Sequence, residues 1–184
     1  VARAGAGTNN IPIPEFSKLG VPVFNPPGAN ANAVKELVVA GLFLAARNIV
    51  DAAAFAHRLE GDHATMDKLV EAGKKNYIGF ELPGRTLGVI GLGAIGVEVA
   101  NVALSLGMTV LGYDPGITVQ HAWALSSQVE HVTDLNELLR RSDIVTLHVP
   151  LVAGTKGLIG ADQFRAMKSS AVLMNFARGP IVDE

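Results

Sequence analysis

Residues 91–96, Gly91-Leu92-Gly93-Ala94-Ile95-Gly96, are the stretch of sequence that decides the fold. They directly follow the apolar run Leu87-Gly88-Val89-Ile90 and open a second apolar stretch, from Ile95 to Leu106. A strand, a glycine turn and a helix in this order are typical of the first crossover in a parallel sheet that binds a dinucleotide. Asp114 ends the next apolar run about 20 residues later, where such sheets carry an acid for the adenosine ribose.

Each glycine of this motif has its own physical role. Gly91 allows the tight turn out of the strand, Gly93 lets the backbone approach a pyrophosphate, and Gly96 lets the helix pack close to the sheet. The pyrophosphate would then lie on unpaired N–H groups at the helix N-terminus, where the helix dipole favours negative charge. The chain has 20 glycines, so a glycine-rich turn without a ligand is the alternative interpretation.

The residues around Asp114 favour NAD over NADP. The carboxylate would accept hydrogen bonds from the ribose hydroxyls, and its charge would repel a 2′-phosphate. No Arg or Lys follows in Tyr113-Asp114-Pro115-Gly116 to hold such a phosphate. We therefore expect NAD as the cofactor.

Composition narrows the class of protein. With 49% hydrophobic residues, 17% charged residues and a net charge of −2, the chain is expected to be a globular domain, and nothing in it indicates a nucleic acid partner. The longest uninterrupted apolar stretch, Leu37 to Ala46, is about half of the ~18 residues that span a bilayer, so no membrane segment is expected. No pair of His or acidic residues at helical spacing has a third ligand in reach, so we expect no metal site.

The chain contains no cysteine, which excludes disulfides, thiolate catalysis and Cys-ligated metals. This composition is compatible with a reducing compartment, and we expect a cytoplasmic protein. The start, Val1-Ala2-Arg3-Ala4-Gly5, has none of the features of a signal peptide and is expected to be the interior of a longer protein.

Strand and helix patterns alternate after residue 84, which predicts an α/β fold with a Rossmann-like, doubly wound parallel sheet. After the first strand and the helix from Ile95 to Leu106, the expected strands are Thr109–Tyr113, Val129–Val132, Asp143–Val149 and Ala171–Asn175, and the expected helices are Asp134–Arg141, begun by Thr133 or Asp134, and a short one near Asp162–Met167.

The first 83 residues have a different organisation. We expect a strand end and glycine turn in Val1–Gly7, an edge strand in Leu19–Phe24, a helix from Val34 to about Ile49 that Asn30 or Asn32 caps and that is buried on most sides, and a polar helical stretch in Asp51–Gly73. The predicted domain boundaries fall near residues 28 and 84. Residues 1–28 would end one domain, 29–83 would form inter-domain helices, and 84–184 would form a dinucleotide-binding domain.

Arg178 follows the last predicted strand, in Asn175-Phe176-Ala177-Arg178-Gly179. Ligands of such sheets bind outside the carboxyl ends of the strands, so Arg178 would face the same crevice as the glycine motif. Its guanidinium could bind a carboxylate with two parallel hydrogen bonds and polarise an adjacent carbonyl. Alternatively, Arg178 caps the strand end or pairs with Asp183 or Glu184.

Several motifs together resemble the D-2-hydroxyacid dehydrogenase family, and the resemblance spans essentially the whole chain. They are Arg3-Ala4-Gly5-Ala6-Gly7 with Asn9-Asn10, Gly84 to Gly96, Leu147-His148-Val149-Pro150-Leu151 with Gly157-Leu158-Ile159, and Asn175 to Glu184. Within the family, Asn25 to Leu37 and the helix after it are similar to the D-3-phosphoglycerate dehydrogenase branch, which begins serine synthesis. The resemblance implies that residues 1–28 end a substrate-binding domain, that the helices of 29–83 also dimerise, and that the NAD-binding domain of 84–184 is incomplete at its C-terminal end.

The resemblance implies a role for each matching residue. Arg178 would be the catalytic arginine that orients the 2-oxo acid, and the turn Ala4, Gly5, Ala6 and Gly7 would offer backbone N–H groups to the same carboxylate from part of a smaller, flavodoxin-like substrate domain. Ala94 and Ile95 would contact the pyrophosphate, Asp114 the ribose, Val149 and Pro150 the adenine side, and Ala6, Phe176 and Ala177 the nicotinamide. The family also uses a histidine that exchanges the substrate proton and a glutamate that holds it; in the family's order both follow Asp183-Glu184.

The resemblance leaves three hypotheses for function. The first is hydride transfer from D-3-phosphoglycerate to NAD, the second is the same chemistry on another small 2-hydroxy acid such as glycerate, glycolate or lactate, and the third is an NAD-sensing scaffold without activity. Arg3 or Lys35 could bind a substrate phosphate, or could be a surface charge. A homodimer or higher homo-oligomer through the hydrophobic faces of Val34–Leu59 is also expected. Of the five histidines, His57, His63, His121 and His131 are expected at the surface, and His148 is expected to be an interior residue with satisfied hydrogen bonds.

Overall fold

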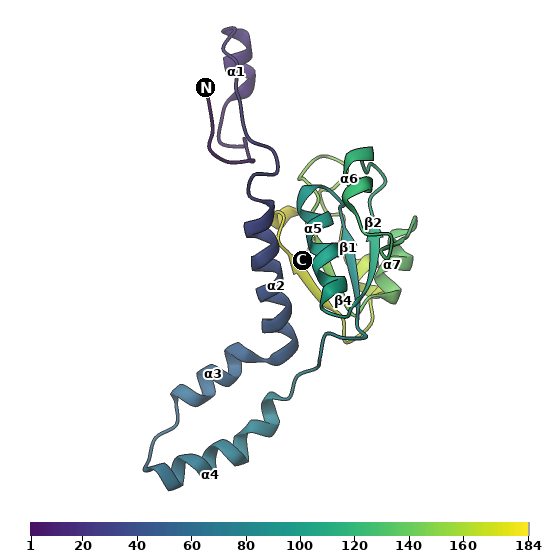
Figure 1. The fold of residues 1–184 in the computed structure, drawn as a ribbon. Helices are drawn as coiled ribbons and strands as arrows, with labels where there is room; N and C mark the ends of the chain where they lie inside the picture. The colour runs from purple at the N-terminus through teal and green to yellow at the C-terminus, as the bar shows by residue number, and fades with distance from the viewer. Residues whose placement is uncertain (184) are drawn as a thin grey trace.

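A parallel sheet of five strands lies within residues 86–175 in the computed structural model, which describes residues 1–183 (Figure 1). The strands are β1 (Thr86–Ile90), β2 (Thr109–Tyr113), β3 (Glu130–His131), β4 (Ile144–Leu147) and β5 (Val172–Asn175). They lie in the order β3-β2-β1-β4-β5, so the order of the strands reverses between β1 and β4. This arrangement confirms the predicted doubly wound sheet, and its reversal point is where such folds bind ligands.

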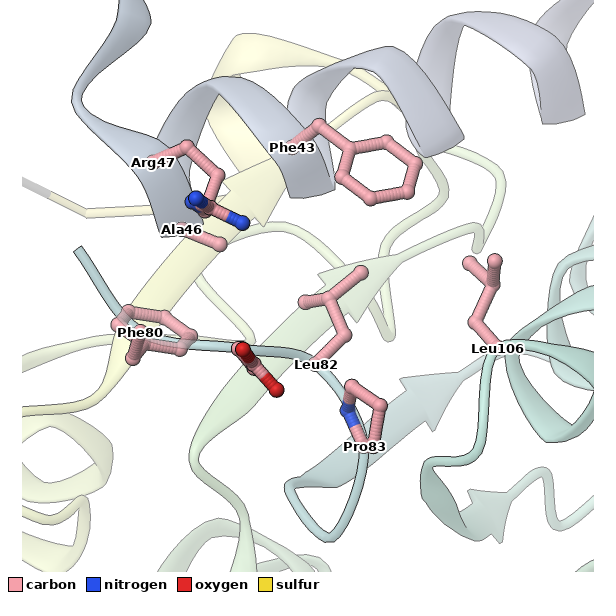
Figure 2. Close-up of a pocket in the computed structure, with 8 residues that line it drawn as sticks. Phe43, Ala46, Arg47, Phe80, Leu82, Pro83 and Leu106 are labelled. Carbon is pink, nitrogen blue, oxygen red and sulfur yellow. The ribbon is translucent and has the colours of Figure 1, made fainter.

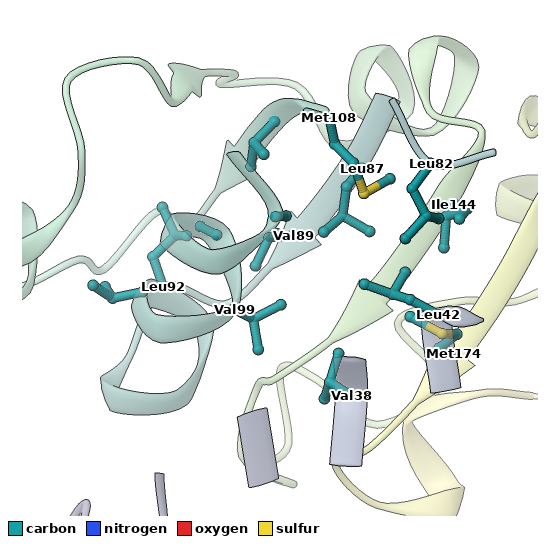
Figure 3. Close-up of a cluster of buried hydrophobic side chains, with 14 of the residues drawn as sticks. Val38, Leu42, Leu82, Leu87, Val89, Leu92, Val99, Met108, Ile144 and Met174 are labelled. Carbon is teal, nitrogen blue, oxygen red and sulfur yellow. The ribbon is translucent and has the colours of Figure 1, made fainter. Parts of the chain in front are cut away.

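Helices cover both faces of the sheet. On one face, α2 (Ala31–Arg47) and α5 (Ala94–Ser105) pack on β1 through a cluster of buried side chains that includes Val38 and Leu42 of α2 (Figure 3). On the other face, α7 (Leu135–Arg141) buries Leu138 and Leu139 against the sheet, near α8 (Ala161–Ala166). β1 has no exposed residue, as expected for the middle strand of a sheet covered on both sides.

A helical arm projects from the sheet domain (Figure 1). It contains α3 (Ile49–His57), α4 (His63–Gly73) and the short 3-10 helix η1 (Lys74–Tyr77). The helix axes of α2 and α3 differ in direction by 66°. The turn occurs at Asn48, which has a left-handed backbone with φ of 49°. Two hydrogen bonds close the base of the arm: Asn48 Nδ2 donates to Ile78 O over 3.1 Å, and Phe80 N donates to Ala46 O over 2.8 Å.

The N-terminal segment differs from the prediction. Residues 1–7 and 19–24 form no strands and share only one parallel bridge, between Ala2 and Phe24. Neither segment has a second strand beside it among the described residues, and Pro22 has no N–H to donate to one. A short helix that the sequence analysis did not predict, α1 (Ile13–Lys18), lies between them.

The predictions for α2 were partly wrong. Asn30 is the residue before the helix, but its side chain makes no capping bond, and Asn32 instead donates to Glu36 and accepts from Lys35. The helix is not buried on most sides: four of its residues are buried, whereas Leu37, Phe43 and Leu44 are exposed. Only the face toward α5 and the sheet has a partner within residues 1–183.

The predicted elements of the sheet domain are confirmed with shifts of a few residues at their ends. Asp134 begins α7, and its carboxylate accepts from Asn136 N. Two elements of the sheet domain were not predicted from the sequence: α6 (Val119–Ala124) and the 3-10 helix η2 (Gly179–Ile181). No single helix within residues 1–183 is long and apolar enough to cross a bilayer; the bent pair α2 and α3 meets that requirement only when the two are joined.

Candidate dinucleotide and substrate site

The glycine turn lies between the carboxyl end of β1 and the first residue of α5. Gly91 has φ of +92°, and a Cβ there would lie 2.8 Å from the carbonyl carbon of His148, so only glycine fits both the turn and the neighbouring chain. A Cβ on Gly96 would lie 1.9 Å from Gly91 O, which explains the tight start of α5. A Cβ on Gly93 would meet no atom within 4 Å. The backbone is therefore open to a ligand at Gly93.

The N-terminus of α5 faces this open space. Gly93 precedes the helix and no side chain caps its first turn, which begins with Ala94, Ile95 and Gly96. Uncapped N–H groups and the helix dipole together form a site for an anion such as a pyrophosphate. The residues at this turn thus fit the group that the sequence predicts.

Asp114 holds the glycine turn in place. Its Oδ2 accepts from Leu92 N over 2.8 Å, and its Oδ1 accepts from Gly116 N over 2.8 Å. Each carboxylate oxygen keeps a further lone pair with which it can accept from a hydroxyl. The side chain is half-buried at the end of β2, so it combines a structural role with the predicted ribose contact.

Arg178 lies on a turn that Asn175 fixes. Asn175 Oδ1 accepts from Ala177 N over 3.0 Å, and Asn175 Nδ2 donates to Arg178 O over 2.9 Å. The Arg178 side chain is exposed and donates to Ala177 O over 2.8 Å. It makes no ion pair with Asp183, and Glu184, the other predicted partner, lies outside the described residues.

The N-terminal turn meets Arg178 across the cleft. A Cβ on Gly7 would lie in ordinary van der Waals contact with Arg178 Nη2, at 3.5 Å, so the guanidinium lies close to the Gly7 backbone. Asn25 Nδ2 donates to Ala6 O over 2.7 Å and thereby ties this turn to the segment before α2. Two parts of the chain that are far apart in sequence therefore form opposite walls of one cleft.

This cleft, of about 620 Å³, contains many of the predicted site residues together. Its lining combines the N-terminal turn, the start of α5 and the carboxyl ends of β4 and β5: Ala6, Gly7, Thr8, Asn9, Ile95, His148, Val149, Pro150, Leu151, Phe176, Ala177 and Arg178. Seven predicted site residues do not line it: Ala4, Gly5, Gly91, Gly93, Ala94, Gly96 and Asp114. Ala94 lines a neighbouring polar pocket beside Gly28. Arg178 is the only permanent charge among the described lining residues, which suits an anionic ligand.

Four further residues line the cleft that were not predicted from the sequence: Thr8, Asn9, His148 and Leu151. Each lies within two positions of a predicted site residue, so extending each motif by one or two positions would have found them. His148 is only partly the satisfied interior residue that we predicted: its Nε2 lies 3.0 Å from Thr146 Oγ1, but its buried Nδ1 has no partner. Burial lowers the pKa of this imidazole to about 4, so it is neutral near pH 7.

The two predicted phosphate-binding candidates do not line the cleft. Lys35 Nζ forms an ion pair with Glu98 over 3.3 Å, which links α2 to α5. The half-buried Arg3 lies over Gly5, and its Nε has no hydrogen-bond partner. Among the other histidines, His57, His63 and His131 are exposed as predicted, and His121 is half-buried.

A separate apolar pocket of about 270 Å³ lies at the opposite end of the sheet (Figure 2). Phe43 and Arg47 of α2 line it together with Phe80, Leu82 and Pro83 of the segment that leads into β1. Because it lies at the amino ends of the strands, it is remote from the glycine turn and from Arg178. Within residues 1–183, no group of three or more His, Asp or Glu side chains is arranged to hold a metal ion.

Comparison with known proteins agrees with this geometry. The model of the D-isomer specific 2-hydroxyacid dehydrogenase NAD-binding domain matches residues 40–184, so the chain belongs to this family and NAD is the dinucleotide of its sheet domain. A D-3-phosphoglycerate dehydrogenase of Methanocaldococcus jannaschii is 42% identical over 184 residues, which are 100% of this chain and 33% of that protein. A hydroxypyruvate reductase of Thermotoga maritima is 39% identical over 184 residues, which are 55% of its length.

Solved structures give the same result. The apo form of Rhodotorula graminis D-mandelate dehydrogenase superposes with a TM-score of 0.83 at 32% identity, over 100% of this chain and 52% of that one. Aquifex aeolicus D-lactate dehydrogenase, complexed with NAD and lactic acid, superposes with a TM-score of 0.74 at 29% identity, over 99% of this chain and 49% of that one. The chain thus spans about a third to a half of the length of these relatives.

Proposed function

We propose that the protein carrying this sequence is an NAD-dependent dehydrogenase of D-3-phosphoglycerate, which it oxidises to 3-phosphohydroxypyruvate in the first step of serine synthesis. The observation that carries the proposal is that Arg178 shares a cleft with Ile95, at the start of α5, and that its guanidinium is the only permanent charge among the described lining residues. D-3-phosphoglycerate dehydrogenases among the relatives support this choice of substrate.

In the proposed reaction, bound NAD would accept a hydride from C2 of the acid. Arg178 would bind the carboxylate and carbonyl, and backbone N–H groups of residues 4–7 would bind the carboxylate from the opposite wall. Asp114 would accept from the ribose hydroxyls, while Phe176 and Ala177 border the nicotinamide. The hydroxyl proton would pass to the histidine that the family resemblance implies, which follows Asp183-Glu184 in the family's order. His148 would not take it, because a pKa of about 4 makes its imidazole too weak a base at neutral pH.

A second candidate is reduction of an unphosphorylated 2-oxo acid. The hydroxypyruvate reductase of Thermotoga maritima supports it, because its 39% identity over the whole chain is close to the 42% of the Methanocaldococcus jannaschii D-3-phosphoglycerate dehydrogenase. No Lys or second Arg lines the cleft among the described residues to receive a phosphate. The third hypothesis, a scaffold that binds NAD without turnover, predicts binding and no activity.

The deciding experiment is NADH oxidation by the protein that carries this sequence, with 3-phosphohydroxypyruvate and hydroxypyruvate at matched concentrations. A clear preference for the phosphorylated acid supports the proposal, whereas equal or reversed rates assign the protein to the reductases. Turnover of neither acid, with NADH still bound, supports the scaffold.

Arg178→Lys should lower turnover by about 100-fold with NADH affinity nearly unchanged, because lysine retains the charge but not the two parallel donors. Unchanged turnover would remove Arg178 from the site.

We also propose a homodimer in which the arm and the exposed face of α2 contact a second copy. Large apolar side chains gather there, among them Leu37, Phe43, Leu44, Ile49 and Val50, all exposed. Exposed apolar surface of this extent is typical of protein interfaces. The Lys35–Glu98 pair lies on the other side of α2, where it joins α5, and would be left intact.

A further inference from the structure

Gly41 lies in the middle of α2, next to the buried Leu42. A glycine inside a helix is unfavourable compared with alanine, so its presence calls for a packing reason. A Cβ on Gly41 would lie 2.9 Å from Cζ and 3.3 Å from Cε2 of Phe176. The end of the Phe176 ring therefore occupies the space that a side chain at residue 41 would need.

Phe176 belongs to the turn that presents Arg178. It lies two residues before Arg178, and both line the cleft. Its ring packs into the cluster of buried side chains between α2 and the sheet, while the two hydrogen bonds of Asn175 hold the backbone around it. A displacement of the ring would thus be passed to the whole turn, because the Asn175 bonds keep residues 175–178 together.

We infer that Gly41 is a positioning residue for Arg178: the bare helix surface at residue 41 seats the Phe176 ring and so fixes the place of the guanidinium in the cleft. The inference rests on the proposed function in one respect, the carboxylate that Arg178 would bind. Alanine at residue 41 would push away only the far end of a side chain, so the fold would survive while the turn moved. Small displacements of an orienting group cause large losses of rate.

The test compares Gly41→Ala with Ala40→Ser, which adds one heavy atom to the exposed side of the same helical turn. Gly41→Ala should lower kcat/KM for the preferred 2-oxo acid on the order of tenfold. The dissociation constant of NADH should change less than about twofold, and the urea midpoint should stay near that of the wild type, since the better helix propensity of alanine offsets the contact. Ala40→Ser should match the wild type in all three measurements. A kcat/KM within about twofold of the wild type for Gly41→Ala would overturn the inference.

A second variant separates positioning from general damage. Phe176→Leu shortens the side chain at the point of contact and will itself affect the cleft, but adding Gly41→Ala to it should cost little further activity. A loss of the same size in both backgrounds would overturn the inference, because the effect of Gly41 would then not pass through Phe176.

A third measurement needs no turnover. The NMR cross-peak of Arg178 Nε–H, assigned by its disappearance in Arg178→Lys, should shift in Gly41→Ala and not in Ala40→Ser. If the wild-type protein reduces no 2-oxo acid, the proposed function fails while this comparison still tests the positioning of Arg178. An unshifted cross-peak in Gly41→Ala would overturn the inference.

Discussion

Asp114 has a structural role in addition to the ribose contact that the sequence predicts. The sequence predicted an acceptor for ribose hydroxyls, whereas the structure adds two backbone donors, Leu92 N and Gly116 N, each at 2.8 Å. Asp114→Ala should therefore lower the free energy of unfolding by about 1–3 kcal/mol, because a partly buried N–H loses its acceptor. It should also weaken NADH binding and reduce the discrimination against NADPH. Urea unfolding and fluorescence titration with both dinucleotides measure these effects.

A matched control is Asp134→Ala, which removes another carboxylate that accepts from a backbone N–H, here Asn136 N at 3.0 Å. It should reduce stability by about 1 kcal/mol and leave dinucleotide binding unchanged. If the two variants bind NADH and NADPH alike, Asp114 has a structural role only.

His148 gives stability a pH dependence. Burial lowers the pKa of its imidazole to about 4, below the 6.5 of an exposed histidine, so below pH 6.5 the unfolded chain binds a proton that the folded chain refuses. The contribution of His148 to the free energy of unfolding is therefore fully present above pH 6.5 and is lost as the pH drops toward 4. The free energy of unfolding falls by about 2 kcal/mol between pH 7 and pH 5. His148→Gln retains a polar group for Thr146 but cannot bind the proton. Between pH 7 and pH 5, its free energy of unfolding should therefore fall by about 2 kcal/mol less than that of the wild type. Urea unfolding at both pH values tests this, and parallel losses would show that another group is responsible.

At the scale of elements, the sequence predicted what depends on local patterns and missed what depends on neighbours. β3 is exposed and polar, and it was found from Val129 and Val132 on either side of it. Strands β1, β2, β4 and β5 were found because each is a short run rich in buried or half-buried apolar residues, and α5 because a glycine motif precedes it. The segments 1–7 and 19–24 have the same local pattern but form only a bridge, since their other strand neighbours are absent from residues 1–183. The end of α2 was placed two residues late, because Asn48 adopts a left-handed backbone that its type permits but does not require.

The base of the arm depends on Asn48. Asn48→Ala should destabilise the link between α2 and α3 by about 1–2 kcal/mol for the backbone, with a further loss from the bond to Ile78 O. Asn48→Gly loses the same bond but tolerates φ of 49°, so it should be the more stable of the two variants. Hydrogen exchange at Phe80 N–H, which closes the base of the arm, should be fastest in Asn48→Ala. Equal exchange in both variants would mean that the left-handed backbone contributes nothing.

At the scale of the whole molecule, the sequence predicted more of the residues of the candidate site than of the packing and exposure of α2. Arg178 and the N-terminal turn belong to motifs separated by about 170 residues, and they line one cleft. The position of Arg178 could be predicted because it follows the carboxyl end of β5, where ligands of such sheets bind. The seat of Phe176 on Gly41 could not be predicted, since it depends on how α2 lies across the sheet. The same holds for the exposed face of α2, which the sequence showed only as an apolar helix.

That exposed face leads to the prediction for the assembly. Val50 on α3 is 63% exposed and belongs to the apolar surface of the arm, whereas Trp123 on α6 is 87% exposed and lies on the sheet domain, away from it. If the arm and α2 bind a second copy, Val50→Asp should shift the protein from dimer to monomer in light scattering, because a buried unpaired charge is strongly unfavourable. Trp123→Asp introduces the same charge in place of a larger apolar side chain and should leave the dimer intact. A dimer that survives Val50→Asp, or a wild-type protein that is monomeric at micromolar concentration, would assign these apolar side chains to a role other than self-association.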